Sequence, residues 1–130
     1  MTSAGAQLLQ GGTIAGALDG AGAVTVNTGT TTLTGTIAST SIDIQAGGTL
    51  STNGGGLAAA AAVTNNGALA LTAGGDESIA SMNGTGTTSL SAGSLLTLNA
   101  GISNIAGVIS GAGGIEVAGG TTTLSSANTF

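Results

Sequence analysis

Residues 14–33 read IAGALDGAGAVTVNTGTTTL, and residues 105–124 read IAGVISGAGGIEVAGGTTTL. Aligned at an offset of 91 residues without a gap, the two stretches are identical at twelve of twenty positions, and three further positions exchange one apolar residue for another. Self-similarity over a long period is typical of repeat architectures, in which similar units stack on one another. The sequence therefore predicts a solenoid or array, which presents a long surface more readily than it encloses a reaction.

The composition of the 130-residue chain narrows the fold class. The chain has 26 Gly, no Lys, Arg, His, Cys, Pro, Trp or Tyr, and Phe130 as its only aromatic residue. Apolar residues make up 41% of the sequence and mean hydropathy is +0.51, so the chain is too apolar for a disordered one. A core without aromatic side chains is narrow and is best filled by stacked aliphatic residues. This favours the interior of a β-solenoid over a sandwich or a barrel.

Short strands are indicated wherever apolar and polar residues alternate between glycine corners. The predicted strands are Val24–Val26, a strand from Thr32, Ile42–Ile44, Leu69–Leu71, Ser89–Ser91, Leu96–Leu98 and Ile115–Val117. Coils of roughly 18–25 residues are usual in such folds, which gives about five to seven coils. We expect residues 1–13 to form an N-terminal edge or linker, and residues 14–130 a solenoid segment of a longer array or a stacked assembly.

Two local alternatives remain open at this stage. The Asn-Gly pairs also suit tight hairpin turns, so a meander of antiparallel hairpins competes with the solenoid. The run Ala58–Ala62 has high helix propensity, but it follows three glycines and is too short to nucleate a helix alone. We interpret it as a tightly packed coil segment, with a short helix as the alternative.

Thirteen inward-facing aliphatic residues are predicted to form the core. They are Val24, Val26, Leu33, Ile42, Ile44, Leu50, Leu69, Leu71, Leu90, Leu98, Ile115, Val117 and Leu124. On this assignment Val117→Asp would abolish folding, because it would bury an unpaired charge.

Residues 109–130 read ISGAGGIEVAGGTTTLSSANTF. The Gly-x-Gly-Gly-aliphatic start, the Thr-Leu pair and the final Ala-Asn-Thr-aromatic sequence resemble the autotransporter-associated β-strand repeat, although Ser126 stands where that repeat usually has Gly. The resemblance covers residues 105–130 and, more weakly, 14–36. It implies a right-handed parallel β-helix in a passenger domain that Gram-negative and related bacteria secrete to the cell surface. It also implies adhesion, autoaggregation or a stalk, and it supplies no catalytic residues.

Charge and hydropathy exclude several partners. The formal net charge is −5 with no Lys or Arg, which argues against nucleic acid and against anionic membrane surfaces. The longest apolar run, Leu57 to Val63, is too short to span a bilayer, so we expect no direct membrane insertion. No basic segment of a secretory signal precedes the repeats, so we expect that a signal was removed or that the chain is an internal piece. The expected partners are the chain itself, end to end or laterally, or a host or neighbouring-cell surface.

The side chains available for chemistry are few. The ionisable residues are Asp19, Asp43, Asp76, Glu77 and Glu116. We predict no catalytic, cofactor-binding or metal-binding residues, and no cofactor. The adjacent Asp76 and Glu77 are interpreted as a solvated corner. The alternative, a polysaccharide-degrading β-helix enzyme, would use two carboxylates. Calcium binding by this pair fails on ligand count.

The sequence suggests two further functions. Thr triplets at residues 30–32 and 121–123 suggest ice binding, which needs a threonine ladder in nearly every coil. Here the triplets recur mainly at the 91-residue period, and the β-propensity of Thr explains them better. A self-assembling extracellular filament subunit is the other alternative, because the open ends of a solenoid expose strand edges that recruit other strands. The preferred prediction is a structural or adhesive, non-catalytic solenoid at the bacterial cell surface.

Overall fold

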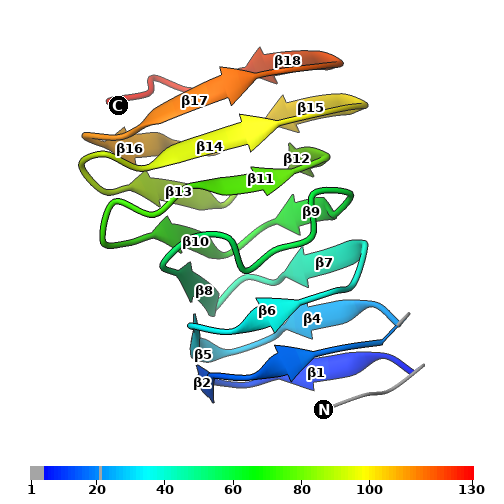
Figure 1. The fold of residues 1–130 in the computed structure, drawn as a ribbon. Coiled ribbons are helices and arrows are strands. Elements are labelled where there is room, and N and C mark those ends of the chain that lie inside the picture. The colour runs from blue at the N-terminus through cyan, green and yellow to red at the C-terminus, as the bar shows by residue number, and fades with distance from the viewer. Residues whose placement is uncertain (1–4, 21) are drawn as a thin grey trace.

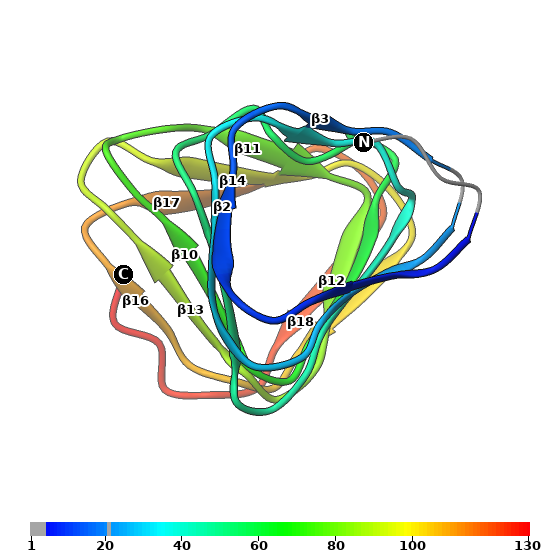
Figure 2. The same cartoon turned by 90° about the horizontal axis from the view of Figure 1, so that it is seen from below.

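The computed structural model describes residues 5–20 and 22–130, which form a parallel β-solenoid of about six turns. Eighteen short strands and no helix are assigned to these residues. Figure 1 shows the coils stacked along one axis, with the two termini at opposite ends. Figure 2 views this axis from the N-terminal end, and the chain turns clockwise as it recedes, so the coil is right-handed. The predicted fold class is confirmed.

Each coil has three sides, which we call the first, second and third faces (Figure 2). The first face contains β1 (Gln7–Leu9), β4 (Val24–Val26), β7 (Ser41–Ile44), β9 (Ala62–Asn65), β12 (Ser81–Asn83), β15 (Ile102–Ile105) and β18 (Thr121–Leu124). The second face contains β2 (Gly12–Ile14), β5 (Gly29–Leu33), β8 (Gly48–Thr52), β10 (Ala68–Leu71), β13 (Thr87–Leu90) and β16 (Ile109–Gly111). The third face contains β3 (Ala17–Leu18), β6 (Thr36–Ile37), β11 (Glu77–Ile79), β14 (Leu95–Leu98) and β17 (Gly114–Val117).

Every strand pairing among the described residues is parallel, which excludes the hairpin meander. Paired residues are 17 apart between β1 and β4, 19 apart between β10 and β13, and 21 apart between β7 and β9. A spacing that varies by only a few residues keeps each side chain above an equivalent one in the next coil. The interior is therefore built of vertical columns of side chains.

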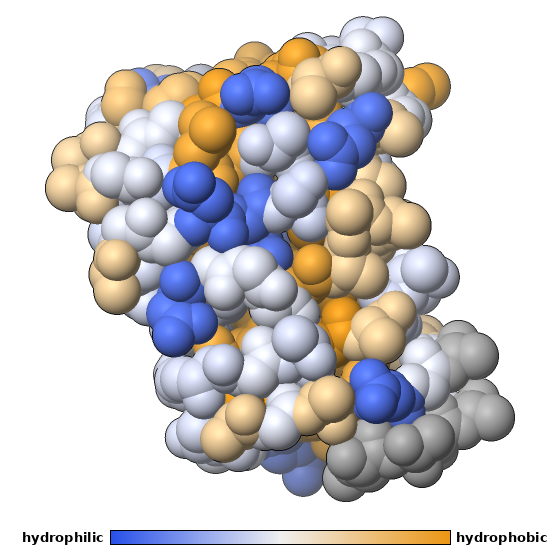
Figure 3. Space-filling model, in the orientation of Figure 1, coloured by the Kyte–Doolittle hydropathy of each residue, from blue (hydrophilic) through white to orange (hydrophobic). Residues whose placement is uncertain are grey.

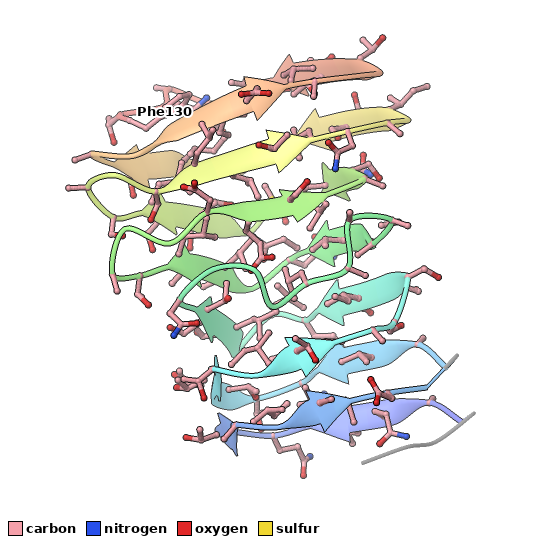
Figure 4. All side chains as sticks on the ribbon, in the orientation of Figure 1. Phe130 is labelled. Carbon is pink, nitrogen blue, oxygen red and sulfur yellow. The ribbon has the colours of Figure 1, made fainter. Side chains whose placement is uncertain are left out.

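The core is one continuous aliphatic cluster inside the coil, to which strands of all three faces contribute, and Figure 4 shows the side chains along the stack. Ten of the thirteen predicted core residues are buried: Val24, Val26, Leu33, Ile42, Ile44, Leu50, Leu69, Leu71, Leu90 and Leu98. The buried apolar residues missing from the prediction are Leu18, Ile37, Leu57, Ala61, Val63, Ile79, Met82, Leu96, Ile105 and Ile109. Leu57 and Ala61 lie outside the strands, and Leu18, Ile37, Met82 and Ile109 belong to strands in which no second apolar residue alternates with them.

The prediction is wrong at the C-terminal end of the coil. Val117 is 49% exposed and Leu124 is 39% exposed, while Ile115 is only partly buried. Their side chains occupy inward positions, since Val117 pairs with Leu98 and Leu124 pairs with Ile105. No described residue covers them from the other side. Val117→Asp therefore does not bury a charge, and it is not expected to abolish folding.

The first copy of the repeat (residues 14–33) and the second copy (residues 105–124) lie on different faces. The first copy runs from the end of β2 through β5, and the second runs from the end of β15 through β18. A strand of the first copy that lies on the second face, such as β5, therefore has its counterpart, β18, on the first face. The faces differ because an offset of 91 residues is not a whole number of coils. The repeat shows that the three faces accept similar sequences.

Glycines at one corner are required for close approach of successive coils. Gly48, Gly67, Gly86 and Gly107 stand above one another between the first and second faces. A Cβ atom on Gly67 would lie 2.2 Å from the Gly48 carbonyl oxygen, and one on Gly86 would lie 2.4 Å from that of Gly67. These four glycines have no positive φ angle, whereas glycines of other Gly-Gly and Asn-Gly turns, such as Gly54, Gly74, Gly84 and Gly120, do have one. Ser126, which replaces the usual Gly of the resembling repeat, lies 19 residues after Gly107 and donates a hydrogen bond to the Ala106 carbonyl.

Two segments complete the coil. Ala58–Ala61 forms a turn in which the Ala61 amide donates to the Ala58 carbonyl, and Ala62 begins β9, so this run is a coil segment and no helix, as predicted. Residues 7–13, which fall in the expected edge or linker, already contribute β1 and part of β2 to the first coil.

Candidate functional site

The five carboxylates are spread along the rod and do not converge. Asp19, Asp76 and Glu116 are exposed, Asp43 is half-buried on the outer side of β7, and Glu77 is buried. Figure 3 shows the polar residues of one side dispersed among small and apolar ones. Among the described residues no three acidic side chains are close enough together to hold a metal ion.

Glu77 is the one carboxylate inside the solenoid, with 1% of its surface exposed. Its Oε2 atom accepts hydrogen bonds from the Thr52 hydroxyl at 2.9 Å and the Gly56 amide at 3.2 Å. Its Oε1 atom accepts one from the Leu57 amide at 2.9 Å. Residues 53–61 carry no regular strand on the third face, so their amides lack a full ladder of partners. The Glu77 carboxylate supplies hydrogen-bond acceptors that a regular strand would otherwise provide, and these bonds hold the irregular segment against the next coil.

The prediction of a solvated corner is therefore correct for Asp76 and wrong for Glu77. Asp76 is exposed and accepts a hydrogen bond from the Leu95 amide at 2.9 Å. Glu77 begins β11, where it pairs with Leu96, and Ile79 two residues later pairs with Leu98. The alternation of Glu77 with Ile79 was the signal that could have placed Glu77 inside. Asp76 precedes β11 and is exposed while Glu77 is buried, so the two carboxylates do not form a facing pair.

The threonine triplets occupy two faces, with residues 30–32 in β5 and residues 121–123 in β18. On the second face the register produces a vertical column of outward side chains, Thr13, Thr32, Ser51, Ala70, Ser89 and Ser110, of which all but Ala70 carry a hydroxyl. Only Thr13 and Thr32 of this column are threonines, and the neighbouring outward column contains Thr30, Thr49 and Thr87. Neither column has a threonine in nearly every coil, because Ala68 and Ala70 interrupt them in β10, and the strands turn gradually from coil to coil (Figure 2).

The C-terminal end of the solenoid exposes a patch of inward residues. Val117, Leu124 and Phe130 are all at least 39% exposed. Thr129 pairs with Ser110, so Phe130 comes directly after the last bridge of the second face, above Gly111. Within the described residues β17 and β18 have a neighbouring strand on one side only. We call this surface the C-terminal end face.

The N-terminal end presents the complementary situation. Leu9 and Ile14 are only partly buried, although they stand under the fully buried Val26 and Leu33. A hollow of about 250 Å³ lies at this end and is lined mainly by Leu9, Ile14, Leu18 and the turn at residues 15–17. We call this surface the N-terminal end face. The two end faces are the sites where the apolar interior meets the outside.

No family model, curated protein or solved structure matches the chain. Within the part of the chain that the structure describes, no helix is long and apolar enough to cross a membrane.

Proposed function

We propose that this chain is a length of a structural or adhesive, non-catalytic β-solenoid on a bacterial cell surface, a stalk or adhesin segment of the autotransporter-passenger kind. The observation that carries the proposal is the set of inward columns, which continue from coil to coil through the described residues. Such an interior supports a rod that can be extended coil by coil. The likeness of residues 105–130 to the autotransporter-associated repeat adds the expected location.

Dimensions support a spacer role. Six coils at a strand spacing of about 4.8 Å give a rod of roughly 29 Å, and each added copy would lengthen it by the same amount. A rod without Lys or Arg and with few charges interacts weakly with nucleic acid and anionic membranes, so it can stand away from the cell that carries it.

Display on cells tests this function. The chain would be placed between a secretory signal and the translocating barrel of an autotransporter, and Leu33→Asp would serve as the misfolded control. We expect surface labelling and protease resistance of the unmodified chain, with adhesion or a greater height of a fused epitope above the membrane. If the folded chain is retained in the periplasm, or reaches the surface without adding height or adhesion, the proposal is wrong.

A further inference from the structure

We propose that the C-terminal end face binds the N-terminal end face of a second copy of this chain, so that the copies stack head to tail with their inward columns continuous. This inference takes from the proposed function only that the end faces are contact surfaces. It names the occupant of both faces and the residues that meet.

The register identifies the pairs. On the first face, Leu9 pairs with Val26 near one end and Ile105 pairs with Leu124 near the other. The strand pairings between them place all four residues in one inward column. In a straight stack, Leu9 of the next copy therefore lies over Leu124. The adjacent inward column places Gln7 of the next copy over Thr122, so a polar side chain meets a polar one.

The second face supplies a side chain and a cavity of matching character. Phe130 is the only aromatic residue and is 46% exposed at the C-terminal end face. It extends the column that includes Ile14, Leu33 and Leu90, which is the column bordering the hollow of the N-terminal end face. A stacked copy would enclose Phe130 between Gly111 below and this hollow above. The exposed ring and the 250 Å³ of empty space would be removed by the same contact.

The backbone edges match as well. All pairings inside the solenoid are parallel, and the last strands at one end run in the same direction as the first strands at the other. Stacking would continue the same ladder, and an exposed strand edge is a template for that kind of pairing. The chain has no Lys or Pro to block it.

Charge gives the stack a recognisable salt dependence. Asp19 follows β3 on the third face at the N-terminal end, and Glu116 lies in β17 on the third face at the C-terminal end, both exposed. A straight stack brings these like charges to the same side of the junction. Their repulsion is screened by salt, so association is expected to become stronger as ionic strength rises.

The experiment blocks each end separately. Phe130→Asp disables the C-terminal end face, and Ile14→Asp disables the N-terminal end face. The unmodified chain should sediment as a series of growing species and form rods of constant width under the electron microscope. Each variant alone should be monomeric. An equimolar mixture of the two should give a dimer and nothing larger, because each variant retains one working end.

Matched controls change an outward residue beside each end face. Thr129→Asp, next to Phe130, and Leu8→Asp, on the outer side of β1 next to Leu9, carry the same new charge outside the columns and should still assemble. Circular dichroism melting verifies that each variant is folded, and Leu9→Asp replaces Ile14→Asp if the latter is not. A monomeric unmodified chain at all salt concentrations overturns the inference, as does dimerisation of either end-blocked variant alone. A monomeric chain that still passes the display test would leave the stalk proposal intact.

Discussion

The two copies of the repeat share most of their sequence but have different surroundings. Val26 and Leu33 in the first copy are fully buried, because the coil formed by β6 to β8 lies above them. Their counterparts in the second copy, Val117 and Leu124, are 49% and 39% exposed. The same residue types face inward in both copies. The repeat therefore fixes the direction of a side chain, while its burial depends on the next coil.

The equivalent glycines of the two copies also differ, but here the second copy is the more crowded one. A Cβ atom on Gly16 in the first copy would meet no atom within 4 Å. On Gly107, at the same position of the second copy, it would lie 1.7 Å from the Gly86 carbonyl oxygen. At both corners the missing Cβ points toward the preceding coil, since a Cβ on Gly35 would meet the Gly16 carbonyl oxygen, and Gly16 itself belongs to the first coil. The burial of an inward aliphatic residue thus depends on the coil that follows it. The steric requirement for these glycines depends on the coil that precedes them.

The largest expected effect comes from charging the equivalent leucine of each copy. Leu33→Asp buries an unpaired carboxylate and should cost more than about 4 kcal/mol of unfolding free energy, enough to prevent folding. Leu124→Asp leaves its charge at an open end and should cost about 1 kcal/mol. Urea unfolding followed by circular dichroism, at concentrations where the chain is monomeric, measures both. Equal losses would show that the second copy is covered in solution.

The fold was accessible from the sequence because every coil applies the same rule. Alternation such as Val24–Val26 or Leu69–Leu71, with glycine between, needs only local information. Burial at the ends was not accessible, since it depends on which coil lies above Val117. Nor was the position of each repeat copy, because the offset of 91 residues becomes a shift of one face only when the lengths of all intervening coils are known.

The second effect tests the region between the copies, where one carboxylate interrupts the apolar columns. Glu77→Ala removes the acceptor of three hydrogen bonds and leaves the Thr52 hydroxyl and the amides of Gly56 and Leu57 without it. Unsatisfied buried donors are costly, so we expect a loss of about 3 kcal/mol. Asp76→Ala, next to it but exposed, removes a single bond and should cost less than about 1 kcal/mol. Thermal and urea unfolding compare the pair, and similar losses would contradict the inward placement of Glu77.

Glu77 also explains why the candidate site could only be predicted in part. Its neighbour Asp76 suggested a corner, and two successive glycines before them support that interpretation in sequence. The buried position follows from residues 53–61, more than fifteen positions away, whose amides need an acceptor. A partner from another coil leaves no mark beside Glu77 in the sequence. The exposure of the end-face residues was equally hard to predict, because it depends on which coil stacks on them and not on the residues beside them in the sequence.

The third effect compares the stability loss on replacing the equivalent glycine of each copy by alanine. Gly107→Ala forces a methyl group against the Gly86 backbone and should cost about 2 kcal/mol through a local shift of the coil. Gly16→Ala has open space and a φ angle outside the positive region, so stability should change by less than about 0.5 kcal/mol or rise slightly through a less flexible unfolded chain. Melting temperatures of the two variants provide the measurement. A comparable loss at Gly16 would mean that another segment packs against the first coil.

The smallest effect exchanges Thr25 and Glu116, which both face outward and form one of the two charged differences between the copies, the other being Asp19 and Ser110. Glu116→Thr should leave stability within about 0.5 kcal/mol, because an exposed carboxylate without a partner contributes little. Thr25→Glu differs because Thr25 pairs directly with Asp43 on the adjacent strand. Like charges opposite each other should cost about 0.5 kcal/mol at low salt, and added salt should restore most of it. A salt-independent loss would indicate that position 25 faces a neighbour other than Asp43, and the register of the first face would then be wrong.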